Sequence, residues 1–201
     1  MPVLFKSLAE FLEKVEATKK RLAIIALTAD FLRRLDADEV EPAVLMILGR
    51  AFPKWSSKTL DVSWATLSGI LQRTAGVDWD VFREAFESTG DIGAAAKAVF
   101  EKADMKKQAL LLGKTLTITE VRRLLGALAG TAGLGSREKK ERLIVALLSQ
   151  ASPVEAKYLV KLFVGEMRTG LQEGLMEQAV AKAFRRRPLT RMAGSIPATS
   201  A

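Results

Sequence analysis

Residues 133–142 combine two closely spaced glycines with a run of cations, in the sequence Gly-Leu-Gly-Ser-Arg-Glu-Lys-Lys-Glu-Arg. Ser136 favours the N-cap of a helix, so we expect a helix to begin there. Arg137, Lys139 and Lys140 would then lie near the positive end of the helix dipole, which costs about 0.3–1 kcal/mol per charge unless an anion binds. Helix starts with approachable backbone amides bind phosphate. The segment predicts a phosphate contact, with Arg137 and Lys140, three residues apart, as the best-placed pair.

A second glycine turn lies at residues 89–93, which are Thr-Gly-Asp-Ile-Gly. Asp91 suits the N-cap of the helix that follows, and Gly93 leaves room for a close backbone approach. Lys97 lies one turn into that helix, where it would assist a phosphate contact. The alternative is a plain capped turn between two helices.

A third candidate is the sequence Met-Arg-Thr-Gly at residues 167–170. We expect a helix to end here, with Gly170 in a left-handed C-terminal turn. Arg168 would then lie near the negative end of that helix dipole, which is favourable without any ligand. This segment and the first one therefore both have an alternative interpretation, as ordinary helix ends with solvated charges.

The composition excludes several kinds of catalytic site. The chain has no cysteine and no histidine, which rules out disulfides, a Ser-His-Asp triad and zinc bound by either residue type. Neither a Walker A motif nor Gly-x-Gly-x-x-Gly occurs. One group of carboxylates is interpreted as a solvated loop and helix start and not as a metal cage: Asp36, Asp38, Glu39 and Glu41. The three tryptophans are expected in the core or partly buried, and not stacked on bases: Trp55, Trp64 and Trp79.

The net charge of +8 is concentrated in the second half of the chain. Residues 1–100 carry 13 cations and 14 anions, whereas residues 101–201 carry 18 cations and 9 anions. A basic half indicates a surface for a polyanion such as nucleic acid. The longest apolar runs are far shorter than the roughly 20 residues that span a bilayer, so we expect no membrane contact.

The elements that must position these segments are all helices. Nearly every stretch has helical periodicity, which predicts an all-α, compact domain of about eleven short helices over residues 1–184. The clearest are expected at residues 22–35, 40–50, 94–102, 119–129, 137–149, 153–168 and 173–184. Ser152, Pro153 and Glu155 form a capping-box start, and Thr119 is expected to cap a helix after a briefly extended segment. Residues 185–201 are predicted to be a disordered or non-native tail.

The order and spacing of the pieces in the second half resemble the N-terminal DNA-binding domain of ATP-dependent DNA ligases of the archaeal and eukaryotic-like type. The resemblance depends on residues 128–136 with the basic helix after them, on Ser152–Leu162, on Val164–Leu171 and on the helix that ends at Phe184. The turn at residues 89–93 matches a further element of the family. The resemblance covers about residues 1–184.

This resemblance implies an all-helical domain that grips nicked duplex DNA across the minor groove without reading its sequence. The implied contacts are two main groups and one weaker group. The first is Gly133, Gly135, Ser136, Arg137, Lys139 and Lys140; the second is Arg168, Thr169 and Gly170; the weaker one is Gly90, Asp91, Gly93 and Lys97. The first two groups are expected to form a two-point grip on the duplex backbone.

The resemblance also implies an internal two-fold repeat that looks incomplete in this chain. The first copy would run over residues 62–93, and the second would begin near Gly170 and continue past Phe184 to another Gly-Asp-x-Gly turn. The sequence from Arg185 onward does not match it. We therefore expect the apolar faces of residues 153–168 and 173–184 to lack a partner.

The adenylation motif of the family, Lys-x-Asp-Gly, does not occur in this sequence. We therefore expect the chain to have no catalytic residues and not to seal a nick by itself. ATP and Mg²⁺ would belong to a catalytic domain outside it, in a parent ATP-dependent DNA ligase of replication, repair and recombination. The implied partners are nicked or intact duplex DNA, that catalytic domain and a sliding clamp, in the cytoplasm at the nucleoid. The alternative is a helical protein–protein interaction module with a solvated basic face.

Overall fold

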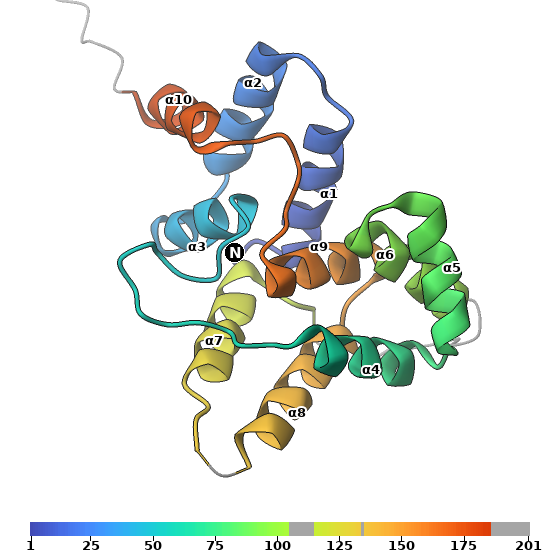
Figure 1. Cartoon of the computed structure of the whole chain (residues 1–201). Coiled ribbons are helices and arrows are strands. Elements are labelled where there is room, and N and C mark those ends of the chain that lie inside the picture. The colour runs from blue at the N-terminus through green and yellow to red at the C-terminus, as the bar shows by residue number, and fades with distance from the viewer. Residues whose placement is uncertain (105–114, 134, 186–201) are drawn as a thin grey trace, which may run out of the picture.

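The computed structural model describes residues 1–104, 115–133 and 135–185, and in these ranges it contains ten α-helices (Figure 1). This confirms the all-α prediction, with ten helices where about eleven were expected. The helices are α1 (Phe5–Glu16), α2 (Arg21–Leu32), α3 (Ala37–Ile47), α4 (Trp64–Ala75), α5 (Trp79–Thr89), α6 (Ile92–Asp104), α7 (Ile118–Ala129), α8 (Ser136–Leu148), α9 (Pro153–Val164) and α10 (Glu173–Phe184). No helix in these ranges is long and apolar enough to cross a membrane. The predicted tail, apart from Arg185, lies outside the described residues.

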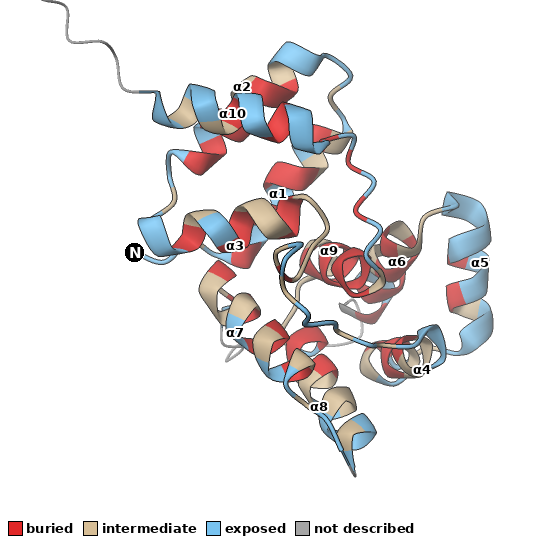
Figure 2. Cartoon of the chain, turned by 60° about the vertical axis from the view of Figure 1, so that its left-hand side comes forward, coloured by how far each residue is buried: buried red, intermediate tan, exposed pale blue. Residues whose placement is uncertain are grey.

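Helix α9 is the centre of the fold. Every residue from Glu155 to Phe163 is buried, and α9 packs against α6 on one side and α1 on the other (Figures 1 and 2). Around this centre α5 packs on α6, α3 packs on α7, and both α4 and α7 pack on α8. The expectation that the apolar face of residues 153–168 lacks a partner was therefore wrong, because helices distant in sequence cover it.

Helix α10 also has a partner, which corrects the same expectation for residues 173–184. Its apolar side, including Leu175 and Met176, is buried against α2. Arg33 at the end of α2 donates hydrogen bonds to the carbonyl oxygens of Lys182, at 2.9 Å, and Ala183, at 3.4 Å. These bonds satisfy carbonyls that a helix C-terminus leaves open. Only Phe184 remains a large exposed apolar residue on this helix.

Local sequence signals predict most helix starts to within one or two residues of their observed positions. The capping box of Ser152 and Glu155 is present with Pro153 as the first helical residue, as predicted. Thr117, and not Thr119, caps α7, because its Oγ1 accepts from the Glu120 amide at 3.1 Å. Thr117 also forms an antiparallel bridge with Leu4, which confirms the brief extended segment.

Two expected helix boundaries beside the candidate site were wrong. Gly135, with a φ of 73°, is the N-cap of α8, so Ser136 is its first helical residue and not its cap. Helix α9 ends at Val164, where Gly165 takes the left-handed position that was expected of Gly170. The segment with Arg168 is therefore a loop between α9 and α10, and the favourable dipole position expected for Arg168 does not apply.

The burial expected for two residues, Glu39 and Trp55, was also wrong. Glu39 is buried at 1 % exposure, because its carboxylate accepts from the Asp36 amide at 3.0 Å and from the Val3 amide at 2.6 Å. It anchors the N-terminal segment instead of facing solvent. Trp55, in the α3–α4 connection, is 89 % exposed and not buried as expected, whereas Trp64 and Trp79 are 41 % and 37 % exposed and pack on Phe82, in line with the expected partial burial.

Candidate functional site

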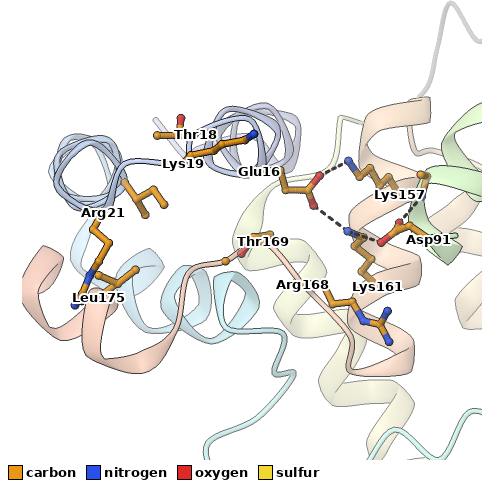
Figure 3. A pocket seen from close by; sticks show the side chains of 13 residues that line it. Glu16, Thr18, Lys19, Arg21, Asp91, Lys157, Lys161, Arg168, Thr169 and Leu175 are labelled. Atoms are coloured by element: carbon orange, nitrogen blue, oxygen red, sulfur yellow. Dashed lines mark hydrogen bonds and ion pairs between the residues drawn. The ribbon is translucent and has the colours of Figure 1, made fainter. Parts of the chain in front are cut away.

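The turn at residues 89–93 and the loop at residues 168–170 lie at one pocket of about 600 Å³. Asp91 and Ala94 line it from the start of α6, and Arg168 to Gly170 line it from the α9–α10 loop (Figure 3). A third wall comes from the end of α1 and the α1–α2 connection. Two of the three predicted segments are therefore neighbours, although about 80 residues separate them in the sequence.

A buried lysine, Lys161, connects the walls of this pocket. Its side chain is 2 % exposed, and its ammonium lies 2.8 Å from the Glu16 carboxylate and 3.0 Å from the Asp91 carboxylate. It also donates to the carbonyl oxygen of Met167 at 3.2 Å. One side chain of α9 thereby holds the end of α1, the start of α6 and the residue before Arg168 (Figure 3).

A second group of charges lies beside it on the same helices. Lys157 forms ion pairs with Glu13 and, at 2.6 Å, with Glu16, and Lys97 binds Glu13 at 2.7 Å. Tyr158 donates its hydroxyl to Glu13 at 3.2 Å. Lys97 was expected to reach a phosphate, but the structure directs it to a carboxylate of α1. It links α6 to α1 through an ion pair.

The charge pairing around Glu13 makes stability depend on pH in the acid range. Partial burial raises the pKa of Glu13, but hydrogen bonds from Lys157 and Lys97 outweigh burial and lower it from 4.5 to about 2. A carboxyl group with a depressed folded-state pKa stabilises the fold above its unfolded pKa and loses that contribution as the pH falls. We expect the free energy of unfolding to fall between about pH 4.5 and pH 2, and less steeply in Glu13→Gln. Urea unfolding at several pH values checks this; parallel pH profiles for the two proteins would contradict it.

Asp91 and Gly93 both have structural roles at the start of α6. The Asp91 carboxylate accepts from the Ala94 amide at 2.7 Å, which confirms the predicted N-cap. Burial raises the pKa of Asp91, but the Ala94 amide and the Lys161 ammonium outweigh it and keep the pKa below its usual value. Gly93 does permit a close approach, but to α9: a Cβ there would lie 2.8 Å from the Lys157 carbonyl oxygen and 2.7 Å from Lys161 Cγ.

Gly93→Ala is therefore expected to destabilise the domain by about 1–3 kcal/mol, because the added methyl group overpacks the α6–α9 contact. Gly126→Ala is the matched control, since it also lies inside a helix and its Cβ would meet nothing within 4 Å. That control should be neutral or stabilising by up to about 1 kcal/mol. Thermal unfolding of both variants measures the difference, and equal melting temperatures would contradict the close contact.

The α9–α10 loop presents a cation and an open backbone at the rim of the pocket. The Arg168 side chain is exposed, with its guanidinium 2.6 Å from Glu166 and directed away from Glu16 (Figure 3). Thr169 is buried and accepts from the Leu171 amide at 3.4 Å, so it shapes the loop. Gly170 has a φ of 77° and no neighbour within 4 Å of a Cβ position, which leaves its backbone accessible to a ligand.

Two cations that the sequence interpretation missed complete this rim. Lys19 and Arg21 line the same pocket from the α1–α2 connection. Both are exposed, and neither forms an ion pair with any residue that the structure describes. Their signal in the sequence is the Lys-Lys-Arg run at residues 19–21, between two helical segments. We define the basic rim as Lys19, Arg21, Arg168 and the Gly170 backbone.

The start of α8 forms a separate candidate contact. Gly133 and Gly135 both have positive φ angles, of 83° and 73°, and no neighbour within 4 Å of their Cβ positions. Arg137 is exposed but pairs with Glu141 at 3.2 Å, and Lys139 is exposed. This segment lines a different pocket, of about 320 Å³, next to residues 61–66.

Lys140 has a structural contact in that second pocket. Its ammonium donates to the Leu60 carbonyl oxygen at 3.0 Å and so fixes the α3–α4 connection against α8. The predicted pair of Arg137 and Lys140 is therefore engaged within the protein. The exposed Lys139 and the glycine backbone remain the accessible groups at this helix start.

The chain matches a family model described as the DNA ligase N terminus over residues 4–181. It is 34% identical over 182 residues to a DNA ligase of Methanothermobacter thermautotrophicus, a match that covers 90% of this chain and 32% of that protein. It is similar at 37% identity to DNA ligase 1 of Korarchaeum cryptofilum, covering 90% of this chain and 32% of the relative. A DNA ligase of Archaeoglobus fulgidus is 34% identical, and the match covers 94% of this chain and 34% of that protein. The chain spans about a third of the length of these relatives.

Proposed function

The chain belongs to the DNA ligase N-terminal family, and we propose on this basis that it binds nicked duplex DNA without reading its sequence. The observation that carries the proposal is the basic rim, where three exposed cations from two distant segments line the same pocket as an open glycine backbone. Cations and backbone amides contact phosphate oxygens, which are the same at every base pair. Such contacts give orientation on the duplex and no sequence preference.

The acidic groups of the same pocket support the proposal because they are neutralised inside the protein. Glu16 and Asp91 both bind Lys161, and Glu16 also binds Lys157. The carboxylates therefore repel a phosphate less than isolated ones would. Lys19 and Arg21 carry exposed charges without an ion pair to any described residue, and Arg168 adds an exposed cation that is paired with Glu166.

The start of α8 supplies a second contact in the same proposal. Its glycine backbone and Lys139 are accessible, and a helix N-terminus favours an anion. The two contacts lie on separate elements, the α9–α10 loop and the start of α8, and we propose that one duplex engages both. We propose no DNA contact for Lys97, which Glu13 holds, or for Gly93, which packs on α9.

In the parent protein this binding would place a nick for catalysis. The relatives named as DNA ligases are about three times as long as the stretch that this chain matches. We propose that the chain positions DNA in the cytoplasm for a nucleotidyl-transfer domain of an ATP-dependent ligase. ATP and Mg²⁺ would be used by that domain.

Binding to two nicked duplexes of unrelated sequence tests this function. Fluorescence anisotropy should give affinities within about tenfold of each other, whereas proteins that read bases prefer their site by at least about 1,000-fold. A 1,000-fold preference would contradict sequence-independent binding. An absence of binding at about 50 mM salt would favour the interaction module with a solvated basic face.

A further inference from the structure

A cluster of aromatic rings extends from the core residue Phe82 to the surface at the edge of the fold, and none of these rings lines the basic-rim pocket. Trp79, Phe82 and Phe86 lie at positions i, i+3 and i+7 of α5 and so share one side of that helix. Trp64, the first residue of α4, packs against them, with ring centroids 6.2 Å from Trp79 and 5.8 Å from Phe82. Trp79 and Phe82 stack at 5.4 Å. We call Trp64, Trp79 and Phe86, anchored by Phe82, the aromatic face.

The aromatic face is largely open to solvent. Phe82 is buried at 2 % exposure, but Trp64, Trp79 and Phe86 are 41 %, 37 % and 43 % exposed. Helix α5 lies at the periphery and is mostly exposed (Figure 2). Contiguous exposed apolar surface on a soluble domain marks an interaction site more often than chance. Aromatic residues are also the ones that contribute most to binding at such sites.

The net charge of α5 is opposite in sign to that of the whole chain. Residues 78–87 carry four carboxylates and one guanidinium, in a protein with a net charge of +8. The guanidinium, of Arg83, pairs with Asp80 at 2.9 Å and Glu87 at 4.0 Å. Asp78 and Glu84 form no ion pair with any residue that the structure describes. Residues 78–87 therefore carry a net negative charge, four carboxylates against one guanidinium, which disfavours DNA and anionic membranes.

We propose that the aromatic face binds a segment of another protein in which lysine or arginine side chains alternate with apolar ones. Apolar side chains of that segment would cover the exposed rings. Its cations would lie over the faces of the two indoles, which attract positive charge, and beside the carboxylates of α5. Trp79 begins α5, and Asp91, which lines the basic-rim pocket, follows the end of that helix, so such a partner would lie about one helix length from the basic rim.

A random-peptide display library selected on the whole chain tests the proposal. Enriched peptides should contain at least two cations among apolar residues. Their binding is measured by tryptophan fluorescence in Trp55→Phe, where the two remaining tryptophans both lie on the aromatic face. Affinity should fall at least about tenfold in Trp79→Ala with Phe86→Ala. It should fall similarly in Asp80→Lys with Glu87→Lys, which keeps all four rings and so remains informative if the first variant fails to fold.

Several results would overturn the proposal. These are enrichment of peptides without cations, no enrichment, or equal binding to the charge-reversed variant. Concentration-dependent dimerisation that Trp79→Ala abolishes would make a second copy the occupant instead. The test is separate from the DNA-binding function, because nicked-duplex affinity should be unchanged in Trp79→Ala with Phe86→Ala. If the chain does not bind DNA, the peptide-binding result is unaffected.

Discussion

Lys161→Met is expected to destabilise the domain by about 2–4 kcal/mol, somewhat less than the 3–5 typical of breaking a fully buried ion pair. Lys161 is 2 % exposed, and its two carboxylate partners are 22 % and 26 % exposed, so water replaces part of the interaction that the variant removes. Methionine fills a similar volume, which isolates the loss of charge from the loss of packing. Asp91 would keep its hydrogen bond to the Ala94 amide but lose its cation.

The melting temperature measures this effect, at about 2–4 °C per kcal/mol for a domain of this size. Lys182→Met is the matched control: this residue lies on an exposed part of α10, and its side chain pairs with no residue that the structure describes. The control should change stability by less than about 0.5 kcal/mol. If Lys161→Met and Lys182→Met unfold at the same temperature, Lys161 does not connect the pocket walls as described.

Removing the three cations of the basic rim should have the largest effect on function. Lys19→Ala, Arg21→Ala and Arg168→Ala together are expected to weaken binding to nicked duplex by about 100-fold at about 50 mM salt. The slope of log affinity against log salt should become shallower by about 0.9 for each phosphate that the variant no longer neutralises. The affinity should fall equally for unrelated sequences, because the rim cations bind phosphates and not bases.

A control of equal charge separates local contacts from the general attraction of a basic protein for DNA. Lys6→Ala, Lys102→Ala and Lys182→Ala also remove three cations, all exposed and none in an ion pair with a described residue. None of them lines the basic-rim pocket. Anisotropy titrations should show at most about a several-fold loss of affinity for this control. Equal losses of affinity in the two triple variants would mean that the rim is not the binding site.

Helix content and most helix starts could be predicted from the sequence because their causes are local. The capping box at Ser152 is set by residues within one turn, and the structure has it as predicted. The predicted end of α9 was wrong because two glycines, Gly165 and Gly170, both suit a left-handed turn. The local sequence does not say which of them ends the helix. Both in fact have positive φ angles.

The candidate site could be predicted only in part, because contacts between distant residues decide it. Lys97 and Lys140 have the right type and position to reach a phosphate. Glu13 and the Leu60 carbonyl, 84 and 80 residues away in sequence, engage them instead. Lys19 and Arg21 form only a short basic run in the sequence, and their place in the same pocket as Arg168 depends on the packing of α1 and α10 against α2.

The most direct test of the DNA-binding account is the salt dependence of wild-type binding to a short nicked duplex. The affinity should fall linearly on a log–log plot between about 50 mM and 200 mM salt, with a slope of about −3 or steeper for three or more phosphate contacts. A slope near zero, or no binding at the lowest salt, would contradict the account.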